Sequence, residues 1–442
     1  MTFANFARPT VLAYGLTLSL CCLAQGGDGG GELWSLHGQS TLTAQYHPSF
    51  RSPYQGANSL EPGNSGRETV DATLFAGLRL WDGGQLYANP EINQGFGLSG
   101  ALGVAGFPSG EAYKVGSPDP HGRLQRLFLR QAFALESPAR AVADGANQLG
   151  GEQPIDSVVL TCGKLAVVDL FDTNSYAHDP RADFLNWSVI DAGAFDYAAD
   201  AWGYTYGAVV EWNQWDWTTR AGVFALSRIP NNKELDRAFG QFALVAEVER
   251  RHAWGGRAGK VKLLGFVNRA RMGRYQDALS LARSTGTAPD VSLVRRMASR
   301  PGVALNFEQQ LGADLGFFAR ASANDGSEEA YEFTEINRSV SVGLSLNGDR
   351  WSRPQDTVGL AVAVNAISNA ARQYLGAGGL GILIGDGALG QYGTEKIAET
   401  YYLLRIGSHW TFTADYQYVD HPAYNRERGP VSVLGARLHA EF

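Results

Sequence analysis

Residues 434–442 read Leu-Gly-Ala-Arg-Leu-His-Ala-Glu-Phe and close the chain. Two kinds of side chain alternate along this stretch. Leu434, Ala436, Leu438, Ala440 and Phe442 share one parity, and Gly435, Arg437, His439 and Glu441 share the other. A period of two puts successive side chains on opposite faces of a β-strand. The segment is therefore predicted to be a strand that separates an apolar environment from a polar one.

The same alternation recurs almost throughout the chain, in runs of about ten residues, which is the length of a transmembrane β-strand. Val340, Val342, Leu344 and Leu346 stand opposite Ser339, Ser341, Gly343 and Ser345, and Val358, Leu360, Val362 and Val364 stand opposite Gly359, Ala361, Ala363 and Asn365. The polar parity would be costly in a dry sandwich core but suits a wet lumen. The pattern predicts an all-β protein, a transmembrane antiparallel β-barrel of about 16 strands.

Short turn signals alternate with long irregular stretches. The turn signals are Asp82-Gly83-Gly84, Asn213-Gln214, Gly312-Ala313, Asn347-Gly348-Asp349 and Gly407-Ser408, and the long stretches lie near residues 48–66, 94–122, 169–199, 271–298 and 369–395. Short periplasmic turns and long extracellular loops are typical of outer-membrane barrels. Segment 137–154 does not fit this scheme, because it is long but falls on the short-turn side. Its role is left open.

The beginning of the chain resembles a secretory signal. Arg8 precedes the apolar stretch 11–23, and Cys22-Leu23-Ala24 forms a small-residue cleavage site. Residues 1–24 are therefore predicted to be a signal peptide, and residues 25–442 a single outer-membrane barrel domain. Cleavage would leave Cys162 as the one cysteine of the mature chain, which excludes an internal disulfide.

The bulk composition agrees with this interpretation. Only 18% of the residues are charged, and the formal net charge is −7, which is too acidic for a nucleic-acid-binding protein. The eight histidines show no metal-binding spacing, and the glycine run 376–381 lacks the context of a phosphate-binding loop. We expect no catalytic residue, no metal and no cofactor, so the chain is not expected to be an enzyme.

Charged and amide side chains on the polar parity are the candidates to line the pore. They are Arg79, Asn89, Glu91, Arg126, Arg130, Arg320, Arg437 and Glu441. A charge facing lipid would cost about 2–4 kcal/mol at mid-bilayer, which favours the inward orientation. Whether each one contacts a solute or only pairs with a neighbouring charge is left open.

The stretches 94–122 and 169–199 are the best candidates to fold inward and narrow the pore. The second is rich in groups that bind hydroxyls, and its candidate constriction residues are Asp172, Asp179, Arg181, Asp183 and Trp187. An external loop solvated by its charges is the alternative.

Several short motifs occur in a recognisable order between Trp34 and Phe442. They are Trp34-Ser35-Leu36-His37-Gly38-Gln39, Asn89-Pro90-Glu91 with Gly95-Phe96-Gly97, Gly163-Lys164, Phe171-Asp172-Thr173-Asn174, Asp183-Phe184-Leu185-Asn186, Glu399-Thr400-Tyr401-Tyr402, Asp415-Tyr416-Gln417 with Pro422, and Gly435-Ala436-Arg437-Leu438. Together they resemble the carbohydrate-selective porins of the OprB family. The resemblance implies a 16-stranded barrel that passes small sugars such as glucose by passive diffusion through a water-filled pore.

The partners implied are small sugars as permeants, outer-membrane lipid, and the outer-membrane assembly machinery through Phe442. A monomer and a homotrimer both remain open. Two other functions are kept as alternatives: a general or anion-preferring porin, and a structural or adhesive barrel with a plugged pore.

Overall fold

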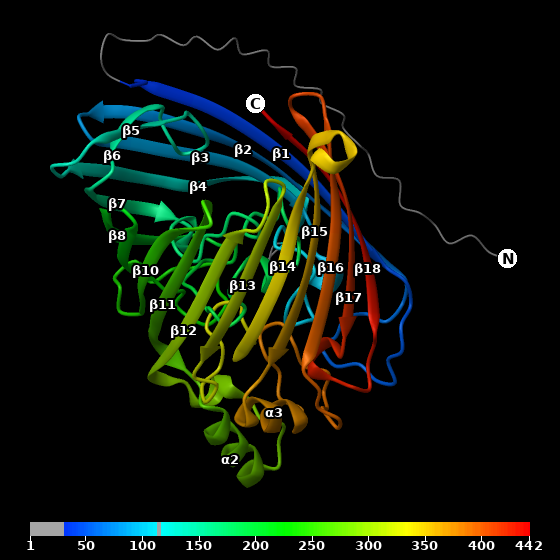
Figure 1. Cartoon of the computed structure of the whole chain (residues 1–442). Helices are drawn as coiled ribbons and strands as arrows, with labels where there is room; N and C mark the ends of the chain where they lie inside the picture. The colour runs from blue at the N-terminus through cyan, green and yellow to red at the C-terminus, as the bar shows by residue number, and fades with distance from the viewer. Residues whose placement is uncertain (1–30, 113–115) are drawn as a thin grey trace.

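The computed structural model describes residues 31–112 and 116–442, which form a closed barrel of antiparallel strands (Figure 1). Its 16 strands are β1 (Trp34–His47), β2 (Ser65–Trp81), β3 (Gly84–Gly95), β4 (Ser117–Ala134), β7 (Ser157–Leu165), β8 (Thr205–Gln214), β9 (Trp217–Ala225), β10 (Phe242–Trp254), β11 (Arg257–Met272), β12 (Arg296–Gln310), β13 (Leu315–Asn324), β14 (Arg338–Gly348), β15 (Arg353–Ala366), β16 (Glu395–Ile406), β17 (Trp410–Asp420) and β18 (Val431–Glu441). Chain neighbours pair throughout, with β4 beside β7, and β18 closes the barrel on β1. The predicted fold class is confirmed. The predicted signal peptide, residues 1–24, lies outside the described residues and stays a prediction, as does the 25–442 domain boundary.

The outer wall is apolar, as the alternation predicts. On β15, Leu360, Val362 and Val364 are 52%, 45% and 43% exposed, whereas the intervening Ala361 and Ala363 are buried. Large side chains that would be hidden in a soluble protein therefore cover the outside of the barrel, where they contact hydrocarbon.

Short turns join the strands at one end. The turn between β10 and β11 is Gly255-Gly256, whose φ angles of 59° and 76° are those that a two-residue hairpin turn requires. The turn predicted at Asn213-Gln214 in fact lies at Trp215-Asp216, because β8 continues to Gln214 and β9 begins only at Trp217.

Long loops occupy the other end. Besides the five predicted from sequence, residues 226–241, 325–337 and 421–430 also form irregular connections there. Two loops carry the helices α2 (Tyr275–Thr285) and α3 (Asn369–Gly376), which lie together at this end, opposite the C-terminus (Figure 1). Within the described ranges, no helix has the length and apolar character needed to cross a membrane.

Segment 137–154 forms a hairpin of β5 (Ala139–Val142) and β6 (Gly151–Pro154) at the short-turn end. Its tip bends into the barrel. Leu149 is buried against Tyr87 and Phe128 of the wall, and Asn147 accepts a hydrogen bond from Asn89 at 2.8 Å. Segment 137–154, whose role the sequence left open, thus forms a hairpin whose tip enters the lumen from the short-turn end.

The lumen is not an open wet tube. The loop between β7 and β8, residues 166–204, folds into it and includes the short helix α1 (Trp187–Ile190). Phe171, Phe184 and Phe195 of this loop are fully buried, and Trp187 stacks on Phe107 with ring centroids 4.9 Å apart. An apolar core therefore lies inside the barrel, and many inward polar residues of the wall contact loop backbone.

Candidate solute pathway

Loop 166–204 is held against β10–β13 by Asp172 near its beginning. The backbone N–H of Asp172 donates to Glu247 at 2.8 Å, and its carboxylate accepts from Asn306 at 2.6 Å and from Arg320 at 3.2 Å. Arg320 also donates to the carbonyls of Val189 and Ala177. All these wall side chains point inward, so they can form hydrogen bonds with the loop.

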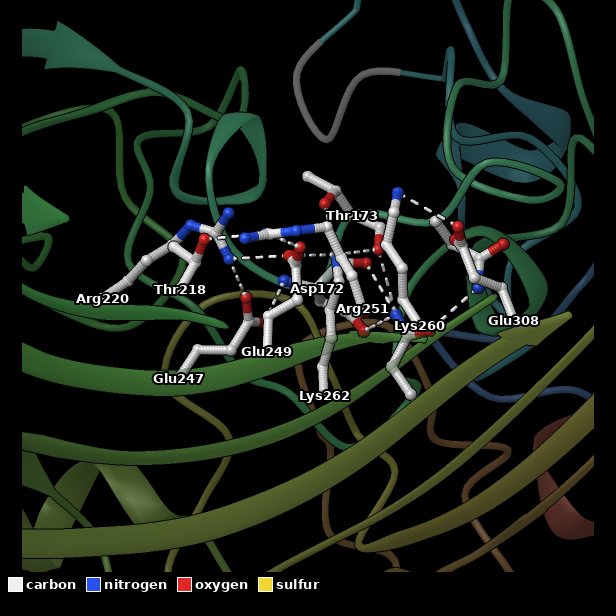
Figure 2. A network of polar contacts seen from close by, with 12 residues as sticks. Asp172, Thr173, Thr218, Arg220, Glu247, Glu249, Arg251, Lys260, Lys262 and Glu308 are labelled. Carbon is white, nitrogen blue, oxygen red and sulfur yellow. Dashed lines mark hydrogen bonds and ion pairs between the residues drawn. The ribbon is translucent and has the colours of Figure 1, made fainter. Parts of the chain in front are cut away.

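A charged network on the inner face of β9–β12 extends this attachment (Figure 2). Arg220 lies 2.8 Å from Glu247 and 3.0 Å from Glu249, and Lys262 donates to the carbonyl of Thr173. Alternating acids and bases satisfy one another here, so each buried charge has a partner. This half of the wall serves to fix the loop.

The opposite side of the loop is held by β16 and β18. The carboxylate of Glu399 accepts the backbone N–H groups of Leu185 at 2.5 Å and Asn186 at 3.1 Å. Arg437 donates to the carbonyls of Pro180 and Asp183 at 2.5 and 2.8 Å. The loop therefore crosses the barrel with both walls bonded to its backbone.

Arg181 projects from the loop toward a third part of the wall. Its guanidinium lies 3.3 Å from Asp71 on β2, 3.6 Å from Glu91 on β3 and 3.4 Å from Glu111 in the loop after β3. Burial alone would lower the pKa of Arg181, but these carboxylates raise it well above its usual value. Arg181 is thus a fixed positive charge facing the β2–β3 wall.

Between loop 166–204 and the inner face of β3, β4 and β7 a cavity of about 510 Å³ remains. Its charged lining is Glu91, Glu111, Arg126, Arg130, Asp169, Asp179, Arg181 and Asp191, and its aromatic lining includes Phe128, Trp187, Trp202 and Tyr204. Residues 146–148 of the hairpin tip also border it. Mixed charges, amides and aromatic rings are therefore gathered around one cavity beside the loop.

The predicted pore-lining residues fall into two groups. Glu91, Arg126 and Arg130 line the cavity. Arg79, Asn89, Arg320, Arg437 and Glu441 do not. Arg320 and Arg437 are about 2% and 0% exposed, because the loop covers them.

The other three lie nearer the short-turn end. Arg79 donates to the carbonyls of Glu32 and Gly150, Asn89 is buried under Asn147, and Glu441 pairs with Arg405 at 2.9 Å. Inward orientation alone does not give access to the passage, because the lumen is largely filled.

The predicted constriction residues divide in the same way. Asp179, Arg181 and Trp187 line the cavity. Asp172 is turned into the contact between the loop and the wall, and the carboxylate of Asp183 accepts the backbone N–H groups of His178 and Asp179 within the loop. The sequence suggested Tyr204 as a ring at the membrane interface and did not single out Asn147, because nothing in the local pattern shows that a distant segment brings either residue to the lumen. The bidentate pair of Arg126 with Asp169, at 2.7 and 2.6 Å, was missed for the same reason.

Protonation brings the lining close to neutrality. Burial, and then the charge of Asp172, raises the pKa of Asp191 to about 8. Burial likewise raises the pKa of the Glu111 carboxyl well above its usual value. With Asp191 in the neutral form, the cavity carries Arg126, Arg130 and Arg181 against Glu91, Asp169, Asp179 and the Glu111 carboxyl, which lies 3.4 Å from Arg181.

The sequence matches the family described as "Carbohydrate-selective porin, OprB family" over residues 57–442, most of the chain. The chain belongs to this family. The resemblance seen in its motifs is confirmed, and the protein is an outer-membrane porin. Among curated proteins, Porin AaxA of Chlamydia abortus is 28% identical over 138 residues, which span 31% of this chain and 27% of that one.

Solved structures show the same fold. A high-pH structure of OprB from Pseudomonas putida superposes with a TM-score of 0.69 at 17% identity, covering 92% of this porin and 94% of that chain. The outer membrane channel DcaP of Acinetobacter baumannii gives a TM-score of 0.50 at 11% identity, with coverages of 94% and 99%. At these identities the likeness concerns the fold alone.

Proposed function

We propose that this porin passes small uncharged sugars through the cavity beside loop 166–204. The observation that carries the proposal is the lining, in which three guanidinium groups and five carboxyl groups, two of them with raised pKa values, surround a cavity with aromatic walls. Sugar hydroxyls both donate and accept hydrogen bonds, so alternating guanidinium and carboxylate groups can replace part of their hydration. Because its positive and negative charges nearly balance, the lining concentrates neither cations nor anions that would compete with a neutral sugar for the cavity.

Arg130 is the lining residue best placed to meet the solute. Arg126 is held by Asp169, and Arg181 is held by three carboxylates. Arg130 forms no ion pair within 4 Å in the described part of the chain. Its guanidinium therefore keeps its donors for water or for a passing sugar.

An anion-preferring pore is the second candidate, and it is less well supported. The arginines that suggested it are matched by acids, and ionisation of Asp191 or Glu111 would make the lining net negative. Liposome swelling with glucose against gluconate separates the two functions. Faster gluconate entry would contradict passage of neutral sugars.

The solute contact is tested with Arg130→Gln in planar bilayers. We expect glucose to block the ion current of the variant less than that of the parent porin, because one donor pair is lost. Arg269→Gln, an exposed arginine on β11, serves as the matched control and should behave as the parent. Equal sugar block in all three proteins would remove Arg130 from the pathway.

We also propose that Phe442 is read by the outer-membrane assembly machinery. Its backbone pairs with Gly38 of β1 through two hydrogen bonds of 2.9 Å, while its ring is 55% exposed. Deletion of Phe442 should lower the amount of porin in the outer membrane without changing single-channel conductance. Unchanged membrane levels would contradict this role.

A further inference from the structure

A second cavity, of about 730 Å³, lies where β7 and β8 reach the long-loop end, beneath residues 226–241. We call it the basic pocket. It is lined by five cationic side chains and three acidic ones: Arg123, Lys164, Arg228, Lys233 and Arg237 against Asp200, Glu234 and Asp236. It shares Trp202 with the pore cavity but is otherwise lined by different residues.

One side of the basic pocket lies on the outer wall, whereas Arg123, opposite the buried Glu91 in the β3–β4 register, and Trp202 lie on its inward side. Lys164 and Tyr206 stand opposite each other in the β7–β8 register, and their chain neighbours Leu165 and Thr205 are buried inward. Successive side chains of a strand point to opposite faces, so Lys164 and Tyr206 belong to the outward parity. Lys164 also donates to the carbonyl of Leu124, whose side chain is 43% exposed.

Three of the cations lie over aromatic rings that line the basic pocket itself. Arg123 lies 3.1 Å from the ring centroid of Trp202, Lys233 lies 5.7 Å from the same ring, and Arg237 lies 4.9 Å from Tyr206. Lys233 and Arg237 are exposed.

The carboxylates do not neutralise these three cations. Across residues 31–112 and 116–442, none of the three has a carboxylate within 4 Å. Asp200 accepts the backbone N–H groups of Trp202 and Tyr204, and Asp236 accepts those of Ala238 and Gln241. Glu234 lies 3.9 Å from Arg228. Asp200 lies 3.8 Å from Lys164. An excess of positive charge is thus positioned on aromatic rings, with no carboxylate in direct contact with Arg123, Lys233 or Arg237 among the described residues.

The wall below the basic pocket is apolar. In the β7–β8 register, the Lys164–Tyr206 pair is followed on the outward face by Cys162–Ala208 and then by Leu160–Val210. Leu160 and Val210 are 40% and 46% exposed. Along the outward face of β7 and β8, cations and aromatic rings are therefore followed by small side chains and then by large apolar ones. A lipid changes in the same order, from its headgroup to its acyl chains.

We propose that the basic pocket binds the phosphate of an anionic lipid headgroup in the outer leaflet, with the acyl chains lying along the outward face of β7 and β8. Basic side chains at the membrane surface attract anionic headgroups, and aromatic rings prefer the same level. An anionic sugar on its way to the pore is a different ligand for the same charges. The outward parity of Lys164 and Tyr206 favours the lipid.

The experiment measures binding of lipid A, a phosphorylated disaccharide lipid, to the full-length porin in detergent micelles by native mass spectrometry. The double variant Lys233→Gln/Arg237→Gln should bind it roughly thirtyfold more weakly, as expected for the loss of two charges near a headgroup. Both residues are exposed in a loop, so the barrel should fold, which a heat-modifiability gel verifies. Lys396→Gln is the matched control, because Lys396 is an exposed cation near the long-loop end of β16 that pairs with Asp420.

Weakened lipid binding in the double variant alone supports the proposal. Equal binding of lipid A by the parent, the double variant and the control overturns it. If the double variant lowers the flux of glucose 6-phosphate through liposome-reconstituted porin and leaves lipid A binding unchanged, the pocket serves a permeant, and the lipid proposal is overturned as well.

Discussion

Arg320 illustrates how one buried side chain can hold a loop across a barrel. Its guanidinium donates to the carbonyls of Asp172, Val189 and Ala177 and to the carboxylate of Asp172. The parity of β13 predicted that Arg320 faces inward. No local pattern could predict its partners, because they lie more than a hundred positions away in the chain. Most of them are backbone carbonyls, which every residue type has. Residue orientation was therefore predictable, while residue role was not.

Arg320→Met tests this attachment. The substitution removes the donors but keeps much of the side-chain volume, and each hydrogen bond to a charged group contributes about 1.5–3 kcal/mol. We expect the loop to open more often, so that trypsin cleaves after Arg181 faster than in the parent. Arg269→Met should leave the cleavage rate unchanged, and equal rates in both variants would contradict the anchoring role.

Asp191 makes the pore sensitive to pH. Burial and the nearby charge of Asp172 raise its pKa to about 8, so the carboxyl is neutral below that pH and anionic above it. Because the folded protein holds this proton more tightly than the unfolded chain, the contribution of Asp191 to stability falls as pH rises from its ordinary pKa of 3.8 toward 8. We expect the preference for cations over anions, measured as the reversal potential in a salt gradient, to increase between pH 7 and 9. Asp191→Asn should abolish this step, and persistence of the step would assign it to another group.

At the scale of elements, the strands were more predictable than the connections. Period-two alternation indicates a strand because side chains that face the membrane must be apolar, whereas those that face the lumen can be polar. The connections 226–241, 325–337 and 421–430 were not recognised as long loops, since no such demand acts on them. The inward fold of 166–204 was proposed from its density of polar groups, but its apolar core of Phe171, Phe184 and Phe195 was not foreseen.

Deletion of residues 174–190 removes the part of the loop that crosses the lumen. We expect single-channel conductance to rise and the preference for sugars to fall, because Asp179, Arg181 and Trp187 leave the passage. Planar-bilayer recording with sugar competition measures both effects. Unchanged conductance would exclude this loop from the conducting path.

The β5–β6 hairpin narrows the other end of the same passage. Replacing residues 143–150 by a short glycine-serine linker should raise conductance by less than the loop deletion, since only residues 146–148 border the cavity. The barrel should remain intact, because β5 and β6 pair only with each other. Conductance equal to that of the parent would show that the tip does not limit flow.

The whole molecule depends on hydrocarbon outside and polar groups inside. On the strands this division was predictable, because it is repeated from strand to strand and a charge facing lipid is costly, whereas the apolar core that the loops form inside the barrel was not. Val362→Arg should destabilise the barrel in vesicles by about 2–4 kcal/mol, whereas Val358→Arg, on the same outward face but nearer the short-turn end, should cost about 0–1 kcal/mol. Urea titration followed by tryptophan fluorescence measures both, and equal costs would contradict the assigned membrane position of β15.

The attachments of loop 166–204 also impose an order on biogenesis. The loop is encoded before the midpoint of the chain. Arg126 on β4 and Asp71 on β2 precede it, but most of the groups that retain it sit on β10–β13, β16 and β18, which are synthesised later. A barrel that has not yet received its final strands therefore lacks the contacts from these strands that hold loop 166–204 inside the lumen. When the last strands pair and close the barrel, they also fix the loop in the lumen. Nonspecific permeability should therefore fall in the same step that closes the barrel.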